Sequence, residues 1–163
     1  MTCYDQIVLI RTFRYPLRPT REQETTLNAW LSQCCDLYNA ALQERRDAWR
    51  KQRVSIGLYD QHKSLTEWRK EDPDATAPRK VHTSALRRVD LAFKGFFRRV
   101  KAGQTPGYPR FRSERRYNSF SVPGDRVSVS GSRVSLPRIG AIAFHPYRSM
   151  RGSLAEVTVR RDP

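Results

Sequence analysis

The segment from Phe93 to Arg116 combines the two kinds of side chain that suit nucleic acids, positive charge and flat rings. It reads FKGFFRRVKAGQTPGYPRFRSERR and contains eight lysine and arginine residues against one acidic residue, Glu114. Guanidinium groups pair with phosphates through two parallel hydrogen bonds, and aromatic rings offer stacking faces to unpaired bases. The whole chain carries a formal charge of +15 and therefore attracts polyanions. The segment predicts a nucleic-acid-binding surface, with acidic lipid as the competing polyanion.

The basic residues of this segment and of the helix before it are the candidates for holding a nucleic-acid backbone. Glu114 alone cannot neutralise the arginines that cluster around it. We expect backbone contacts from Arg87, Arg88, Lys94, Arg98, Arg99, Arg110, Arg112, Arg115 and Arg116. The three phenylalanines of the segment fall on an apolar helical stripe and are expected in the core. Tyr108 and Phe111 flank a proline in a loop, where they either pack against the fold or contact bases.

The sequence offers no set of residues suited to catalysis. Phosphodiester hydrolysis generally needs carboxylates gathered around a divalent metal, but 12 of the 16 acidic residues lie at or before Asp90, mostly in helices crowded with Lys and Arg. His62, His82 and His145 have no partner Cys or Ser at a recognised spacing. No C-x2-4-C pair suggests zinc, and no glycine-rich phosphate loop is present. We predict no catalytic residue, no metal site and no cofactor.

The cysteine count and the hydropathy favour a reduced cytoplasmic protein. The three cysteines are Cys3, Cys34 and Cys35, an odd number without disulfide spacing. No apolar run approaches the roughly 20 residues of a membrane span, and the first residues do not resemble a signal peptide. We therefore expect a cytoplasmic location, compatible with nucleoid association, and no membrane partner.

The first half of the chain reads as one strand followed by three helices. Residues 6–15 are rich in β-branched and aromatic residues and predict a strand that ends before Pro16. Thr20 and Gln23 form a capping-box pattern, and apolar residues at three- and four-residue steps, Trp49 among them, continue the helix to about Lys51. A shorter helix is expected from Leu58 to the region of Asp72 and Pro73, and a third from Pro78 to Gly103.

After Gly107 the pattern alternates with a period of two, which is typical of strands. Residues 119–122, 126–130, 133–136, 141–144 and 154–161 are the candidates. An isolated first strand is not stable, so we expect it to pair with these late strands. The predicted fold is α+β, a small, wedge-like β-barrel interrupted by an insertion of about three helices. The expected domains are a discontinuous barrel, residues 1–18 and 104–163, and a helical lobe, residues 19–103.

Several short motifs resemble the TnpB (OrfB) family, RNA-guided nucleases encoded by bacterial insertion sequences. The first is F-R-Y-P-L-R-P-T-R-E-Q at 13–23, followed by Cys34 and Tyr38-Asn39. The others, in family order, are Ala85-Leu86-Arg87, Ala92-Phe93-Lys94, Phe96-Phe97-Arg98-Arg99, Pro106-Gly-Tyr-Pro-Arg-Phe111, Leu136-Pro137-Arg138-Ile139-Gly140 and Val157-Thr158-Val159. The run covers residues 7–160, and together these motifs are specific where each alone would be weak.

The resemblance implies a wedge barrel and a recognition lobe that grip a guide RNA and read a short motif beside the DNA target. The positions that would read this motif are Tyr59, Arg79, Thr83 and Ser121. Many relatives have Gln at the position of Thr83, and Gln can bond adenine through two hydrogen bonds where Thr cannot. The family continues into a RuvC nuclease domain with three metal-binding acids. We expect this chain to lack that domain and not to act alone as an enzyme.

Three hypotheses follow for the function. The first is the nucleic-acid-gripping half of a TnpB-like protein from a shortened or split reading frame, with guide RNA and target DNA as partners and a separately encoded nuclease domain as a further candidate. The second is a stand-alone, helix-turn-helix-like repressor that places helix 80–102 in the DNA major groove. The third is an inert truncated remnant that folds poorly on its own.

Overall fold

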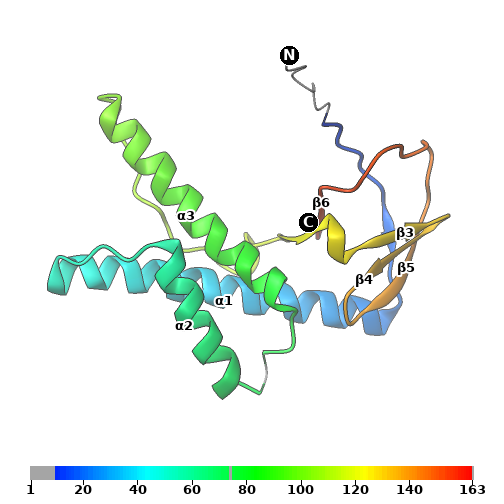
Figure 1. The fold of residues 1–163 in the computed structure, drawn as a ribbon, viewed down its shortest axis with the longest axis horizontal. Coiled ribbons are helices and arrows are strands. Elements are labelled where there is room, and N and C mark those ends of the chain that lie inside the picture. Colours follow the sequence, from blue (N-terminus) through cyan, green and yellow to red (C-terminus); the bar gives the residue numbers. More distant parts are fainter. Residues whose placement is uncertain (1–9, 74, 163) are drawn as a thin grey trace, which may run out of the picture.

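The computed structural model describes residues 10–73 and 75–162, which form three helices and two antiparallel sheets (Figure 1). The helices are α1 (Arg21–Gln52), α2 (Leu58–Glu71) and α3 (Arg79–Lys101). The strands are β1 (Leu17–Arg18), β2 (Ser119–Pro123), β3 (Ser128–Ser130), β4 (Arg133–Leu136), β5 (Gly140–Phe144) and β6 (Glu156–Arg160). The predicted α+β class and the three predicted helices are confirmed.

Local signals in the sequence set the ends of α1 and the start of α2. The Thr20 hydroxyl accepts a hydrogen bond from the Gln23 amide at 3.3 Å, and the Gln23 side chain accepts one from the Thr20 amide at 3.0 Å, which is the predicted capping box. Helix α1 ends at Arg53, whose φ of 57° is left-handed. The amide of Gly57 then donates to the Asp60 carboxylate at 2.9 Å and starts α2.

One continuous core joins the helices to both sheets. The buried face of α1 meets the sheets through Trp30, whose ring lies edge-on to Phe120 of β2 with 5.8 Å between centroids. Tyr38, two turns further along α1, packs against the fully buried Tyr117 at 5.9 Å. Burial of these large rings contributes the main hydrophobic stabilisation.

A buried polar cluster fastens the three helices to one another. The Arg45 guanidinium of α1 lies 3.3 Å from the Asp90 carboxylate of α3, and its Nε donates to the Gln61 side chain of α2 at 2.8 Å. The Gln61 amide in turn donates to the Ala41 carbonyl at 2.8 Å. The guanidinium also lies 5.3 Å from the centre of the Phe93 ring. Each helix therefore contributes a hydrogen-bonding group to one desolvated cluster.

The first strand pairs with a late strand, as predicted, but it occupies different residues. Leu17 of β1 pairs with Phe144 of β5, and the sheet order is β1-β5-β4-β3. Residues 10–16 lie outside any described strand, and the predicted residues 6–9 fall outside the described part of the chain. The ladder begins after Pro16, which has no amide hydrogen to donate. Tyr15 instead packs its ring against Phe144, at 5.2 Å between centroids.

The strands in the described residues form two separate sheets, where the sequence predicted a small barrel, and they do not close into one. Strands β2 and β6 pair only with each other. The chain leaves β2 through a 3-10 turn at Gly124–Arg126, which turns it away from its partner into β3. A Cβ atom on Gly124 would come within 1.9 Å of the Leu154 carbonyl oxygen, so only glycine fits this crossing. The predicted division into two domains stays a prediction.

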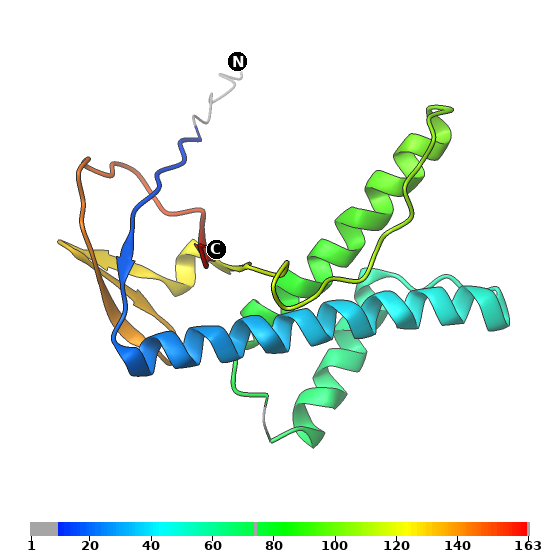
Figure 2. The ribbon, with the colours of Figure 1, turned by 180° about the vertical axis from the view of Figure 1, so that it is seen from behind.

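The distal half of α3 does not belong to the core, contrary to the helical stripe. Val81 and Val89 are fully buried, but Phe97 is 55% exposed and Val100 48% exposed. Figures 1 and 2 show the reason, because α3 rises away from α1 toward its C-terminal end. Phe93 is half-buried and packs against the core, and Phe96 is half-buried at the start of the part of α3 that leaves it.

A buried histidine at the start of α3 makes stability depend on pH. His82 is fully buried, with Nε2 3.2 Å from the Gln33 side-chain oxygen and Nδ1 in contact with the Arg69 guanidinium. Burial, assisted by the charge of Arg69, lowers the pKa of His82 from its ordinary value of 6.5 to about 4. The neutral ring therefore donates through Nε2 to Gln33 and accepts through Nδ1 from Arg69.

We expect the free energy of unfolding to fall as the pH drops from about 6.5 towards 4. In that window the unfolded state binds a proton that the folded state refuses, so the stability present above pH 6.5 is lost on acidification. Urea denaturation at pH 7 and pH 5 measures this slope. His82→Gln should reduce the slope, whereas His145→Gln at an exposed position should leave it intact. An equal slope in wild type and His82→Gln would contradict the assignment.

Candidate nucleic-acid interface

The loop that follows α3 is fixed to α1 by several side chains of that helix, Tyr38 and Asn39 among them. We call residues 104–116 the basic loop. Asn39 of α1 holds Arg112 of the loop by both backbone groups: its side-chain oxygen accepts from the Arg112 amide at 2.9 Å, and its amide donates to the Arg112 carbonyl at 2.8 Å. The Tyr38 hydroxyl donates to the Arg110 carbonyl at 3.4 Å. These contacts give a structural reason for the Tyr38-Asn39 motif, and the helical pattern alone could not reveal it.

The other side of the basic loop is fixed to α3 by Tyr108. Its ring lies edge-on to Phe93 at 5.8 Å and to Phe96 at 5.4 Å between centroids. The guanidinium of Arg99 also donates to the Gly107 carbonyl at 3.4 Å. Tyr108 therefore packs against the fold, which is one of the two roles left open by the sequence, while 44% of its surface stays exposed.

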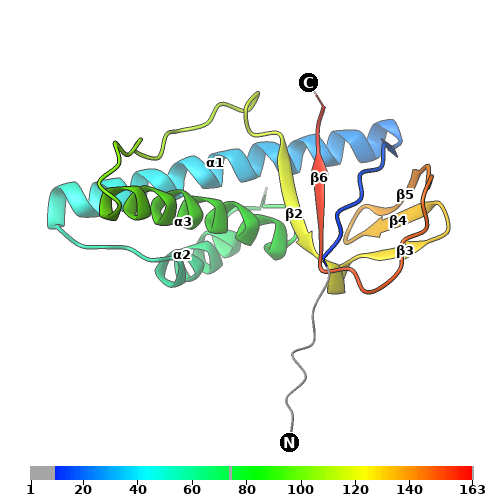
Figure 3. The same ribbon diagram turned by 90° about the horizontal axis from the view of Figure 1, so that it is seen from above.

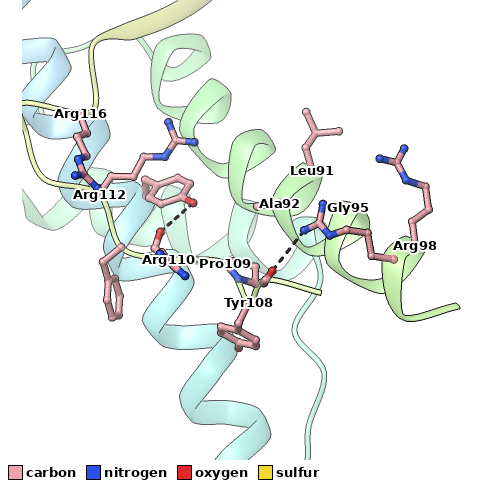
Figure 4. Close-up of a pocket in the computed structure, with 13 residues that line it drawn as sticks. Leu91, Ala92, Gly95, Arg98, Tyr108, Pro109, Arg110, Arg112 and Arg116 are labelled. Atoms are coloured by element: carbon pink, nitrogen blue, oxygen red, sulfur yellow. Dashed lines mark hydrogen bonds between the residues drawn. The ribbon is translucent and has the colours of Figure 1, made fainter. Parts of the chain in front are cut away.

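Between α3 and the basic loop lies an open groove of about 640 Å³ (Figure 4). Helix α3 supplies Arg98 and Arg99, while the loop supplies Arg110, Arg112 and Arg116. Figure 4 shows the loop running beside the helix, with Arg98 on the helix side and the loop arginines on the other. The fold thus brings together arginines that lie up to 18 residues apart in the sequence.

Six arginines on these two elements, five of them exposed and Arg99 half-buried, form what we call the basic face. Its members are Arg98, Arg99, Arg110, Arg112, Arg115 and Arg116. Within the described residues, none of the six forms an ion pair, and no acidic residue lines the groove. Arg112 rests over the Tyr38 ring at 5.3 Å, which orients its guanidinium without neutralising it. The charge of this face is therefore available to an anionic partner.

The remaining three predicted backbone contacts lie apart from the basic face. Arg88 donates to the Ser119 carbonyl at 2.6 Å and to its hydroxyl at 3.0 Å, and it lies 5.1 Å from the centre of the Tyr117 ring. Arg88 therefore connects α3 to β2 within the fold. Lys94 pairs with Asp90 at 2.9 Å but keeps 72% of its side chain exposed. Arg87 is exposed on α3.

A second groove on the other side of the basic loop contains residues that the sequence analysis did not select. It lies against the last turns of α1, where Arg46, Trp49 and Arg50 face Tyr108, Pro109, Arg110 and Phe111. Trp49 was expected on the buried stripe of α1, but it is 53% exposed because no other element covers this end of the helix. The sequence signal that could have indicated this groove is the excess of arginine around a tryptophan near the end of a helix.

Three of the four predicted motif-reading residues are connected through neighbouring contacts. Arg79, in the first turn of α3, donates to the Thr66 hydroxyl of α2 at 2.8 Å, and Thr83 lies one turn further along α3. The next residue, Ser84, accepts from the Ser121 amide of β2 at 3.4 Å. Tyr59 lies two turns before Thr66 on the same side of α2 and is 74% exposed. We call these four predicted residues, which lie on α2, α3 and β2, the motif-reading row.

The described residues contain no group of three His, Cys, Asp or Glu side chains placed to hold a metal ion. Cys34 and Cys35 are free and buried, and Cys3 lies outside the described residues. Burial raises the pKa of the Cys34 thiol to about 12, so it remains protonated and unreactive at neutral pH. None of the described helices has the length and apolar character that would let it cross a membrane.

The fold and its surface define a basic α+β protein with an arginine-rich face suited to a polyanion. Comparison with known proteins shows which family this chain resembles. The family profile of the OrfB (IS605) helix-turn-helix domain matches residues 9–53. Over 159 residues the chain is 26% identical to InsQ of Escherichia coli (strain K12), provisionally named an RNA-guided DNA endonuclease, covering 92% of this chain and 37% of InsQ.

A second relative agrees with the first. Over 109 residues the chain is 29% identical to a protein of Streptomyces pristinaespiralis, also provisionally named an RNA-guided DNA endonuclease, covering 65% of this chain and 26% of that protein. The resemblance to the TnpB (OrfB) family is therefore confirmed, and the chain is a relative of these proteins. It spans between a quarter and two fifths of the length of the two relatives.

The region that matches the helix-turn-helix family has a simple structure in this chain. Within residues 10–53 it consists of an extended lead, the two-residue strand β1 and the single unbroken helix α1. The turn that follows α1, residues 53–57, lies at the edge of the match, and α2 begins beyond it. Strand β1 pairs with β5 and is followed directly by α1, so the matched region joins the sheet to the helices.

Proposed function

We propose that this chain grips a guide RNA with the basic face and reads a short target-adjacent DNA motif with the row that contains Arg79, Thr83, Ser121 and Tyr59. The observation that carries the proposal is the set of arginines without ion pairs that the clamped basic loop and α3 present together. Arginine forks bind phosphates strongly, and a fixed backbone lowers the entropy lost on binding.

The proposed roles also give meaning to the predicted division of the chain. If residues 19–103 act as a recognition lobe, and residues 1–18 and 104–163 as a wedge domain, the basic loop lies at the joint between them. A backbone bound there contacts both parts at once, through Arg98 on α3 and through the arginines of the loop. RNA binding would then stabilise one arrangement of the two parts by mass action.

The motif-reading row supports selectivity of a limited kind. Thr83 offers one hydroxyl, which can donate or accept a single hydrogen bond at a base edge, whereas a bidentate side chain discriminates more strongly. Arg79 is held at its tip by Thr66, so its guanidinium is already oriented before DNA arrives. We propose that Arg79 supplies more of the discrimination than Thr83.

We propose no catalytic role for the described residues. The metal-binding carboxylates for target cleavage would come from elsewhere, such as a separately encoded nuclease domain. On this view the chain is the recognition component, and its partners are the guide RNA, the target DNA and that nuclease. Mixing experiments with a TnpB-type nuclease domain address this partner directly.

The function is tested by RNA binding at several salt concentrations. The purified chain is expected to carry nucleic acid that RNase removes and DNase does not. After that RNA is stripped, a hairpin RNA with a single-stranded tail should bind with an affinity that falls steeply with salt, because each neutralised phosphate releases counterions. A protein free of RNA that also fails to bind the hairpin at low salt would refute the proposal.

The alternative of a stand-alone repressor that inserts α3 into the major groove has less support. Its proximal half is buried against α1, α2 and β2, and Arg88 and Lys94 are engaged by Ser119 and Asp90. A recognition helix needs its base-reading residues exposed along one face. Tighter binding to one duplex sequence than to a scrambled duplex, without any RNA, would favour the repressor instead.

A further inference from the structure

The groove between the end of α1 and the basic loop has the composition of a site for unpaired bases. It has a volume of about 670 Å³, which lies in the range of small-ligand pockets. Helix α1 contributes Arg46, Trp49 and Arg50, and the facing wall is formed by the loop from Tyr108 to Phe111. The wall is held in place by the Tyr38 and Asn39 contacts and by the packing of Tyr108 on α3.

Two aromatic rings in this groove keep half of their surface open to solvent. Trp49 is 53% exposed and Phe111 is 48% exposed. Each has an arginine above it: Arg53 lies 5.7 Å from the Trp49 ring centre, and Arg46 lies 5.9 Å from that of Phe111. A ring flanked by a guanidinium offers a stacking surface beside a phosphate-binding group.

The charge of the groove selects among the possible occupants. Its lining residues include three arginines and no acidic residue, and the whole chain carries a formal charge of +15. A second copy of the chain would bring the same positive charge and is disfavoured by repulsion. A duplex hides the faces of its bases, so it could use the arginines but not the rings. An unpaired strand uses both.

We propose that this groove binds an unpaired segment of RNA, with bases stacked on Trp49 and Phe111 and phosphates held by Arg46, Arg50 and Arg110. The inference rests on the proposed function, because it makes an RNA the resident partner and names the part of the RNA that this second site takes. Stacking accepts any base, so the groove holds a single strand without reading its sequence.

The test uses a uridine-rich RNA of about 15 nucleotides, close to the upper site size of single-strand binding folds. Two further ligands are compared with it: the same RNA as a duplex, and a single-stranded DNA of the same sequence. Binding is followed by anisotropy of a labelled strand and by tryptophan fluorescence, which stacking on Trp49 quenches. We expect Trp49→Ala and Phe111→Ala each to lower the single-strand affinity about tenfold. Duplex affinity should change less than twofold.

Two further variants separate stacking from folding. Trp49→Phe keeps a ring, so single-strand affinity should stay within about threefold while the fluorescence quenching disappears. Ile10→Ala removes an apolar residue that is 78% exposed, precedes β1 and does not line the groove, and it should change neither signal. Because Trp49 and Phe111 are half-exposed, their replacement should leave the thermal melt of the protein unchanged.

The outcomes distinguish this inference from the function on which it rests. The stacking site is refuted, and the proposed function stands, if the wild-type chain binds RNA and either of two results is found. In one, Trp49→Ala and Phe111→Ala lower the duplex and single-strand affinities equally; in the other, these variants lower neither affinity. If single-stranded DNA binds as tightly as RNA, and the two alanine variants lower its affinity by as much, the assignment to RNA is refuted. If the wild-type chain binds no RNA at low salt, both proposals fail.

Discussion

Replacing the four freest arginines of the basic face with glutamine is expected to weaken RNA binding about 100-fold at moderate salt. The four are Arg98, Arg110, Arg115 and Arg116. Within the described residues none of the four guanidinium groups forms an ion pair, so their loss removes phosphate contacts without breaking the fold. The slope of log affinity against log salt should become shallower by about 3, at roughly 0.7 per phosphate contact on single strands.

The measurement is a series of anisotropy titrations with the hairpin RNA across salt concentrations. A matched control replaces four exposed arginines near the sheets, Arg11, Arg14, Arg126 and Arg133, which changes the net charge equally. If the control lowers affinity and slope as much as the basic-face variant, binding depends on net charge and the proposed site is wrong. Unchanged affinity in the basic-face variant leads to the same conclusion.

Removing the carboxylate of the buried polar cluster is expected to have the largest effect on stability. Asp90→Ala leaves the Arg45 guanidinium, whose side chain is 8% exposed, without its ionic partner. An uncompensated buried charge costs about 3–5 kcal/mol. For a chain of this length, we expect the Tm to fall by about 10 °C. The same change removes the ion pair with Lys94 at the surface, a smaller loss.

Thermal melts followed by circular dichroism check this expectation, and two comparisons interpret it. Asp47→Ala breaks the exposed pair with Lys51 and should lower the Tm far less than Asp90→Ala does, because solvent screens an exposed pair. The double variant Arg45→Met, Asp90→Leu removes both charges and should recover much of the loss, since apolar side chains can replace a buried pair. If Asp90→Ala costs no more than Asp47→Ala, the cluster does not hold the helices together.

The same melts address the hypothesis of an inert remnant. The continuous core and the buried cluster predict a cooperative transition for the wild-type chain. A gradual, non-cooperative change in helicity would instead mean that the helices depend on a partner for their packing.

The parts of the fold that rest on local chemistry could be predicted from the sequence. The capping box at Thr20 and the breaks at Gly57 and Pro78 gave helix limits within a few residues of those observed. A cluster of arginines in a short loop also predicts a positively charged surface in the folded protein, because few acidic residues are available to neutralise it. Such signals depend on neighbours in sequence and require no knowledge of the packing.

The errors arose where the packing partner determines the outcome. A helical stripe shows that Trp49 and Phe97 share a face with core residues, but not that α1 and α3 diverge before they reach these positions. Alternation predicted the late strands, but not that a close crossing at Gly124 separates them into two sheets. The role of Asn39 depends on a loop 73 residues away, which no periodicity can indicate.

The unbroken length of α1 has a mechanical consequence. Its 32 residues extend about 48 Å, and the helix is anchored at one end where the Gln23 side chain donates to the Ala141 carbonyl of β5 at 3.1 Å (Figure 3). At the other end it carries Trp49. Between these ends its buried face packs against Phe120, Tyr117 and Asp90, so the helix is fixed along most of its length. A ligand seated on Trp49 is therefore held at a set distance and direction from the sheet.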